Sequence, residues 1–390
     1  MAERRARLGQ RHRLAAAARA DDPLDVAHAL VALHATDPSS VYLAAWARMR
    51  DEAGDVAAVE SALYERRVLI RLLGMRRTVF VTPLEVAPVI LAGCTRAIAA
   101  RERRRLISLL ADSDVAGDPE AWLKEVEDAA LRSLAARGQA TAAELAADDP
   151  RLQAKIVMAR GKPYEGRVSV CSRVLFVLAA DGRVVRGRPI GSWASSQYRW
   201  AVLEAWCPDG MPELATEAAE TELARRWLAA FGPGTPEDLR WWTGWTAGQA
   251  RRALARVGAV EVDLDGATGL VLPDDLEPVP APEPWAALLP PLDPTPMGWS
   301  QREWFLGEHG PALFDRNGNV GPTIWWDGRI VGGWAHRPDG EITCRLLEDV
   351  GEGAVAAVHT AAERLAARLG PVRITARARG QTLIEQELAG

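Results

Sequence analysis

The sequence of 390 residues contains few cysteines and no long apolar run. Its four cysteines, Cys94, Cys171, Cys207 and Cys344, are far apart and show no Cys-x-x-Cys spacing, which argues against a zinc knuckle and a disulfide framework. No run approaches the roughly 18 apolar residues of a membrane span, and the basic residues 1–13 precede no signal-peptide core. We therefore expect a cytoplasmic protein that is neither exported nor inserted into a membrane.

Several motifs of enzyme chemistry are also missing. The sequence has no Walker loop, dinucleotide fingerprint or nucleophile elbow, so we expect no nucleotide cofactor and no serine-hydrolase chemistry. His309, His336 and His359 have no acidic residues at metal-ligand spacing, and we predict no metal site. With 48% hydrophobic residues, the chain is long enough for two to four globular domains.

Lysine is rare, since arginine supplies nearly all of the 47 basic residues. Arginine suits phosphate recognition, but the arginine and alanine bias of a GC-rich genome explains the same count. The formal net charge is −5, yet cations cluster at residues 101–105, 183–188 and 251–252. Net charge therefore does not decide whether the partner is a nucleic acid.

A repeat appears at an offset of 94 residues, where residues 134–145 (LAARGQATAAEL) align with residues 228–239 (LAAFGPGTPEDL). Each copy predicts a helix ended by glycine and a second helix capped by threonine with an acidic residue three positions later. The second copy is followed by a capping box, Thr246 with Gln249, and by a hairpin around Asp265 and Gly266. Helices followed by a hairpin indicate a winged helix.

The same order of elements is predicted twice more. After the first copy come a helix over 168–180 and a strand over 183–186, and at the front of the chain come helices begun at Asp22 and Asp37. The expected fold class is therefore α+β, mostly α, with three tandem winged helices. Their predicted bounds are 15–82, 118–192 and 215–275, with a helical connector over 83–117.

Prolines crowd residues 276–296 and mark a boundary. Beyond it, strands flank Asp327 and Gly328 in a strong hairpin signal, further strands are expected at 342–347 and 372–376, and a helix is expected over 353–369. We predict a small β-rich domain over 285–390, of the partly closed barrel kind. Most of the 15 tryptophans lie inside predicted elements and are interpreted as core.

Several motifs occur together in one order, and with them the chain resembles the AlkZ-like DNA glycosylases over roughly residues 15–375. The catalytic triplet of that family, Gln-hydrophobic-Gln or Gln-hydrophobic-Asp, falls on His34, Ala35 and Thr36. The other motifs are residues 43–48 (LAAWAR), 76–78 (RRT), 238–244 (DLRWWTG) and 288–294 (LLPPLDP).

This resemblance implies a C-shaped protein of three winged helices and a C-terminal β-barrel. It also implies binding to duplex DNA and cofactor-independent hydrolysis of the N-glycosidic bond of bulky alkylated purines, including crosslinks. One chain with three DNA-binding units needs no symmetry partner, so we expect a monomer.

The candidate catalytic residues are His34, Thr36 and Asp37, placed at the end of a helix predicted over 22–33. An N7-alkylated purine is cationic and leaves readily, so the enzyme mainly holds a water and stabilises positive charge on the sugar. Neutral His34 can accept a proton from that water, Thr36 can orient it, and Asp37 can steady the imidazole or offset the sugar charge.

Each of these residues also has a structural interpretation. His34 shares a helical face with Leu24, Ala27, Leu30 and Val31, and can be a histidine at the edge of the core. Asp37 before Pro38 has the pattern of a helix N-cap, and Thr36 can serve the turn alone.

For contact with DNA phosphates, the sequence offers arginines in each predicted unit. Each of them alone is equally well a solvated surface residue. They are Arg76 and Arg77 in the first wing, Arg173 in the third helix of the second unit, Arg183, Arg186 and Arg188 in its wing, and Arg251 and Arg252 in the third unit.

Three functions stay open at this point. The first is a DNA repair glycosylase. The second is a DNA-binding protein without catalysis, which serves lesion recognition, self-resistance or transcriptional regulation. The third is a scaffold whose winged helices bind protein.

Overall fold

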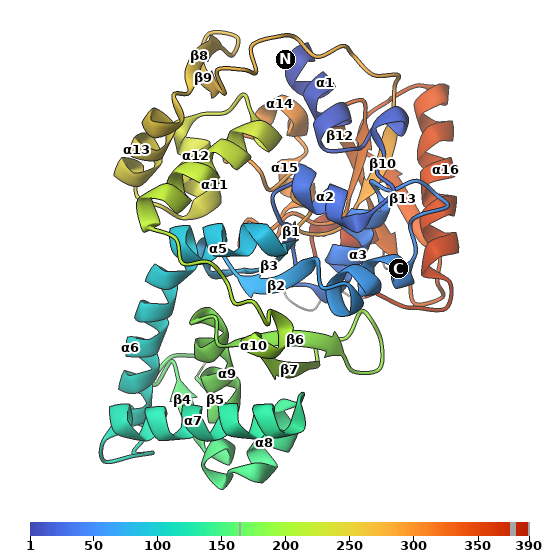
Figure 1. Ribbon diagram of the computed structural model, residues 1–390. Coiled ribbons are helices and arrows are strands. Elements are labelled where there is room, and N and C mark those ends of the chain that lie inside the picture. The colour runs from blue at the N-terminus through green and yellow to red at the C-terminus, as the bar shows by residue number, and fades with distance from the viewer. Residues whose placement is uncertain (164, 375–379, 389–390) are drawn as a thin grey trace.

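The computed structural model describes residues 1–163, 165–374 and 380–388. The fold is mixed α+β and mostly helical (Figure 1). In Figure 1 a lower lobe, formed by the helices and strands of residues 119–206, lies beneath a larger upper body, and the helix α6 (Arg96–Asp112) runs down one side to join them. Within the described residues, no helix is long and apolar enough to cross a membrane.

The front unit contains three short helices and a three-stranded sheet. Its antiparallel strands lie in the order β1-β3-β2. An unpredicted helix, α1 (Ala2–Arg11), precedes it. The elements are α2 (Pro23–Ala29), β1 (Leu33–His34), α3 (Pro38–Trp46), α4 (Val56–Glu60) with a π-helical turn at Ser61–Glu65, β2 (Leu69–Leu73) and β3 (Val79–Pro83).

The helix predicted over 22–33 is wrong at its C-terminal end. Helix α2 stops at Ala29, and Val31 has a positive φ of 65°. Leu33 and His34 pair instead with Val81 and Phe80 of β3. Sheet hydrogen bonds thus replace the last helical turn, and the helical face predicted to include His34 does not exist.

A helical connector and the lower lobe follow. The hairpin of β6 and β7 has a long connection, residues 190–197, and it extends beyond the predicted limit of 192. A second hairpin, β4 with β5, was not predicted. The elements are α5 (Ala87–Ile90), α6 (Arg96–Asp112), α7 (Pro119–Arg137), α8 (Ala142–Asp148), β4 (Lys155–Met158), β5 (Gly166–Ser169), α9 (Val170–Ala180), β6 (Val184–Pro189), β7 (Tyr198–Val202) and α10 (Leu203–Trp206).

The capping boxes expected from the repeat are confirmed. Thr141, Thr235 and Thr246 each accept a hydrogen bond from the backbone N–H three residues later, and the side chain at that position caps in return. The elements after the second copy are α11 (Thr216–Phe231), α12 (Pro236–Thr243), α13 (Ala247–Val257), β8 (Val260–Asp263) and β9 (Thr268–Val271). The division of the chain into winged-helix domains stays a prediction.

The C-terminal region contains a four-stranded antiparallel sheet in the order β10-β11-β12-β13. Within the described residues, β10 and β13 are its two edges, so no closed barrel forms. Residues 372–374 of the strand expected at 372–376 are not in a strand, and the last two lie outside the described residues. The elements are β10 (Ala286–Leu289), α14 (Glu303–Leu306), α15 (Gly310–Leu313), β11 (Thr323–Trp326), β12 (Arg329–His336), β13 (Ile342–Leu346), α16 (Glu352–Leu369) and α17 (Leu383–Leu388).

Tryptophans fill much of the core, as expected. Among the 15, only Trp122, Trp241 and Trp326 are half-buried, and the rest are buried. Trp299 packs edge-on against both Phe231 and Trp304. Such clusters bury large apolar areas where the third helical unit meets the C-terminal region.

A buried polar network joins segments that are distant in sequence. Arg48 and Asp293, both fully buried, form a two-pronged ion pair at 2.6 and 2.9 Å. Arg48 also donates to the Thr295 hydroxyl at 2.8 Å, which lies 2.8 Å from Nδ1 of His12. Nε2 of His12 lies 3.0 Å from the Ala230 carbonyl. The network therefore links the N-terminal segment, the front unit, α11 and the C-terminal region.

Removing one partner of this ion pair is expected to destabilise the fold strongly. Asp293→Ala leaves the Arg48 guanidinium buried and unpaired, which costs about 3–5 kcal/mol. Denaturant unfolding of the variant measures this loss. Asp339→Ala, in an exposed 3.7 Å pair with Arg337, is the control and costs at most about 1 kcal/mol. Equal losses in the two variants would contradict the central role of the buried pair.

The network also makes stability depend on pH. Burial, with the charge of Arg48, lowers the pKa of His12 from 6.5 to about 3. The unfolded chain therefore takes up a proton below pH 6.5 that the folded chain refuses, so the His12 contribution is complete above 6.5 and falls as the pH drops toward 3. Between pH 7 and 5.5 the wild type should lose roughly 1 kcal/mol more than His12→Gln. Parallel pH profiles of the two unfolding free energies would contradict this.

Candidate active site

The loop of residues 35–38 connects β1 to α3 and contains two of the candidate catalytic residues, Thr36 and Asp37. The Ala35 N–H donates to the Val79 carbonyl at 2.8 Å and so extends the pairing of β1 with β3. Asp37 then caps α3, because its carboxylate accepts from the Ser39 N–H at 3.2 Å and the Ser39 hydroxyl at 2.8 Å. Thr36, between these two fixed points, is exposed.

His34 lies behind this loop rather than in the open. It is 5% exposed, and its ring packs edge-on against Phe80 at 5.0 Å. Nδ1 accepts a hydrogen bond from the Thr36 N–H at 3.4 Å, so the ring proton is on Nε2. Burial and the charge of Arg76 lower the pKa of His34 to about 3, which keeps the imidazole neutral at physiological pH.

The loop faces a cavity of about 500 Å³ between the front unit and the lower lobe. Thr36 contributes its exposed side chain to one wall. The other walls come from the start of α8 and from the β6–β7 hairpin with its connection. The residues that line it are Ala35, Thr36 and Pro38, then Thr141, Ala142 and Ala143, and then Arg186, Ile190, Ser196, Gln197, Tyr198 and Trp200.

Only Thr36 and Arg186 among the predicted site residues line this cavity. Asp37 is buried and lines a second cavity, of about 180 Å³, toward the C-terminal sheet with Trp334 and His336. The three predicted catalytic residues are therefore separated, because the His34 ring is enclosed, the Thr36 side chain faces one cavity and Asp37 faces another. The catalytic roles of all three stay predictions.

Sequence reasoning missed the opposite wall of the cavity. Gln197 and Tyr198 come from the long connection and the second strand of the β6–β7 hairpin, beyond residue 192, where the second unit was predicted to end. A two-residue turn such as Asn-Gly would have marked that hairpin. The polar run of residues 195–198 (SSQY) before an alternating strand was the one signal available.

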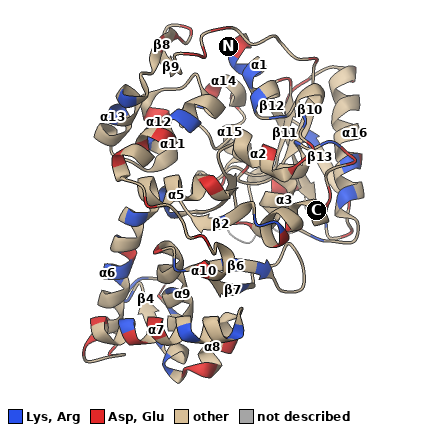
Figure 2. Ribbon diagram, in the orientation of Figure 1, with Lys and Arg blue, Asp and Glu red and all other residues tan. Residues whose placement is uncertain are grey.

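The predicted DNA-contact arginines occupy different surroundings. Arg76 lies 4.0 Å from the centre of the Trp241 ring, and Arg302 lies over the same ring at 4.5 Å. Arg77 forms an ion pair with Glu102 at 2.7 Å, and Arg188 pairs with Glu60. These side chains already have partners. Figure 2 shows basic residues spread over both the upper body and the lower lobe.

The remaining arginines are less constrained. Arg183, Arg251 and Arg252 are exposed, and Arg173 is half-buried. Burial and the charges of Arg77 and Arg105 lower the pKa of Arg173. Contact of any of these arginines with DNA stays a prediction. Within the described residues, no group of three or more His, Cys, Asp or Glu side chains can hold a metal ion.

Comparison with known proteins identifies the family. The model of the family described as DNA glycosylase AlkZ-like matches residues 27–368. The chain belongs to the AlkZ-like DNA glycosylase family. Its fold is similar to that of the Streptomyces sahachiroi DNA glycosylase AlkZ, with a TM-score of 0.71 and 22% identity over 96% of this chain and 98% of that one. No curated protein matches the chain.

The motifs that carry the family resemblance mostly stabilise the fold. Arg48 and Asp293, from two of them, form the buried ion pair. Asp238, from a third, is the acidic member of the capping box that begins α12 and accepts from the Thr235 N–H at 3.0 Å. It also accepts from the Ser300 N–H and hydroxyl at 2.9 and 2.8 Å. Family membership is thus readable from structural residues, whereas the triplet at His34–Thr36 differs from the family pattern.

The state of His34 can be measured directly. Side-chain nitrogen NMR at pH 5 is expected to show a neutral ring protonated on Nε2, because a pKa of about 3 lies well below that pH. The signal is assigned by its loss in His34→Gln. Titration of this signal with a midpoint near 6.5 would show that the ring is open to water and would contradict the buried geometry.

Proposed function

We propose that this AlkZ-like family member is a DNA glycosylase that hydrolyses the N-glycosidic bond of N7-alkylated purines in duplex DNA, including crosslinked ones. The observation that carries this proposal is the cavity beside Thr36. Its volume of about 500 Å³ lies within the range of about 300–1,000 Å³ found for small-molecule sites. Aromatic and polar side chains line it together, as expected for a pocket that takes an extruded nucleotide.

Thr36 is the proposed residue that holds the attacking water. Its side chain is exposed in the cavity, and a hydroxyl both donates and accepts hydrogen bonds. The exposed Gln197 side chain on the opposite wall offers an amide as a second polar group. A cationic leaving base needs no strong acid, so orientation of water suffices for the chemistry assigned to this site.

Two neighbours support Thr36. His34 is the positioning residue, because its Nδ1 holds the Thr36 N–H and its ring is wedged against Phe80. The Asp37 carboxylate lies close enough to Tyr198, on the cavity wall, to contribute to raising the pKa of that phenol, after burial and Tyr64. Although the carboxylate faces the second cavity and caps α3, its negative charge is proposed to act from behind the loop on positive charge that develops on the sugar.

The test is release of N7-methylguanine, and unhooking of a defined N7-purine crosslink, from duplex DNA under single-turnover conditions. Thr36→Val keeps the shape and removes the hydroxyl, and the rate should fall about 100-fold. Thr360→Val, at an exposed threonine on α16, is the matched control and should keep the wild-type rate. His34→Ala should also be slow, because the loop loses its anchor.

The other outcomes are informative. Release by Thr36→Val at the wild-type rate would remove the threonine from the mechanism. Binding of duplex DNA without release by the wild type would instead favour a non-catalytic protein for lesion recognition, self-resistance or regulation. The buried His34 and the altered triplet are the observations that keep this alternative open.

A further inference from the structure

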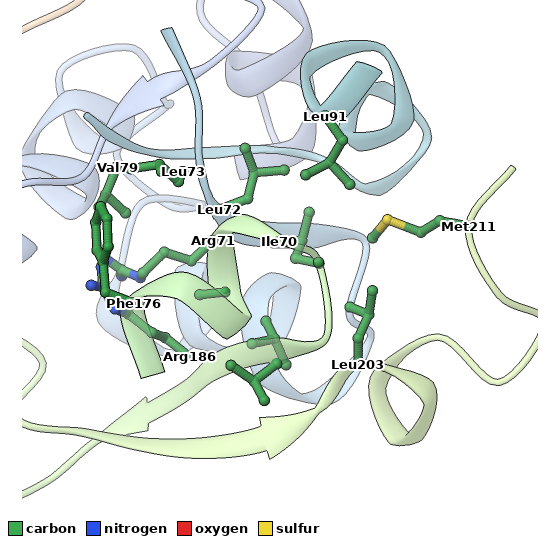
Figure 3. A pocket seen from close by; sticks show the side chains of 14 residues that line it. Ile70, Arg71, Leu72, Leu73, Val79, Leu91, Phe176, Arg186, Leu203 and Met211 are labelled. Carbon is green, nitrogen blue, oxygen red and sulfur yellow. The ribbon is translucent and has the colours of Figure 1, made fainter. Parts of the chain in front are cut away.

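Two arginines that the mechanism does not use meet between the front unit and the lower lobe. Arg71, on β2, is 4% exposed, and Arg186 is half-buried on β6. Figure 3 shows both side chains extending in the same direction, toward Phe176, along a small apolar pocket. Both guanidinium groups lie against Tyr198, at 4.9 Å from its ring for Arg71 and 5.7 Å for Arg186.

Neither guanidinium has a carboxylate partner within the described part of the chain. Arg71 donates one long hydrogen bond, 3.4 Å, to the Ala35 carbonyl, and its Nε donates none. Three phenols, Tyr198, Tyr64 and Tyr42, lie close enough to raise the pKa of Arg71 against the effect of its burial, but none of them is a carboxylate. Arg186 makes only ring contacts, with Tyr198 and, at 5.1 Å, with Trp200. The buried Arg48, in contrast, is matched by Asp293.

This arrangement is electrostatically incomplete. Burial and the charge of Arg71 lower the pKa of Arg186 to about 10, whereas the neighbouring tyrosines raise the pKa of Arg71, so both groups are charged at neutral pH. Buried like charges are costly unless a counter-charge and hydrogen bonds compensate them. An anion between the two guanidinium groups supplies both.

The position of Arg71 and Arg186 indicates which kind of anion they bind. Arg186 lines the same cavity as Thr36, and Arg71 holds the carbonyl of the residue before Thr36. Guanidinium groups match the planar oxygen pairs of a phosphate with two-pronged hydrogen bonds. We propose that Arg71 and Arg186 together bind a backbone phosphate of the DNA strand, next to the nucleotide that occupies the cavity.

This inference uses the proposed function only for the nature of the ligand, DNA, and not for hydrolysis. A phosphate held by both arginines would link β2 of the front unit to β6 of the lower lobe. Substrate binding would therefore neutralise the pair at a contact that β2 and β6 already make. Tyr198 lies against both guanidinium groups and leaves their N–H donors for the phosphate, except the Arg71 N–H that donates to the Ala35 carbonyl.

The first experiment measures binding of a duplex that contains a tetrahydrofuran abasic analogue, which has the phosphates but no glycosidic bond. Arg186→Gln should weaken binding about 10-fold or more, because a hydrogen-bonded charge contact is lost. The slope of log K against log salt should decrease by about 1. Arg71→Lys, which keeps a charge but loses the fork, should weaken binding less. Arg345→Gln, on β13, is the control and should bind as the wild type does.

The second experiment replaces single phosphates of that duplex with neutral methylphosphonates. At one position near the analogue, the neutral replacement should weaken binding by the wild type. It should not weaken binding by Arg186→Gln further, because that variant already lacks the contact. Equal additional losses at every position, or unchanged binding by Arg186→Gln, would overturn the proposal. The proposal would also be overturned if inorganic phosphate protected the protein against thermal unfolding while no position in the duplex showed this behaviour. The site would then bind a free anion.

These readouts are independent of catalysis. If the wild type binds the analogue with the expected arginine dependence and yet releases no base, that result contradicts the glycosylase proposal and leaves the phosphate-site proposal standing. If the wild type releases base and Arg186→Gln binds normally, the phosphate-site proposal is contradicted and the glycosylase proposal is supported. Circular dichroism of each arginine variant confirms that a loss of binding is not a loss of fold.

Discussion

The buried pair of Arg48 and Asp293 is the interaction on which the arrangement of this protein depends. Together with Thr295 and His12, it fastens the end of α3 to the segment after β10 and to α11. A buried ion pair adds little net stability over an apolar contact, but it is intolerant of any other geometry. It therefore determines where α3, and with it the loop of residues 35–38, lies relative to the rest of the upper body.

Two parts of the chain contribute different walls of the candidate site. The front unit supplies a rigid loop, anchored on one side by the pairing of Ala35 with Val79 and on the other by the Asp37 cap. The lower lobe supplies a polar and aromatic wall from the long β6–β7 hairpin. Neither part forms the cavity alone, so the chemistry proposed for Thr36 would depend on how the two parts meet.

Local signals in the sequence predicted much of the fold but little of how the front unit and the lower lobe pack together. The capping boxes of Thr235 and Thr246 and the Asp327–Gly328 hairpin depend on neighbouring residues, and the structure contains them. The end of α2 depends on pairing between His34 and Phe80, more than 40 residues away, which no periodicity reveals. Arg71 was missed for the same reason, since an arginine inside an apolar strand becomes meaningful only when Arg186 and Tyr198 stand opposite it.

The exposed pair of Arg188 with Glu60 and Glu65 has a consequence for how this protein responds to ions. It spans the lower lobe and the front unit at the surface, where added salt weakens attraction between opposite charges. A DNA phosphate that binds Arg188 must first displace those carboxylates. If Arg188 binds DNA as predicted, salt would weaken both the phosphate contact and the competing ion pair, and the ionic-strength dependence of DNA affinity would underestimate the number of phosphates contacted.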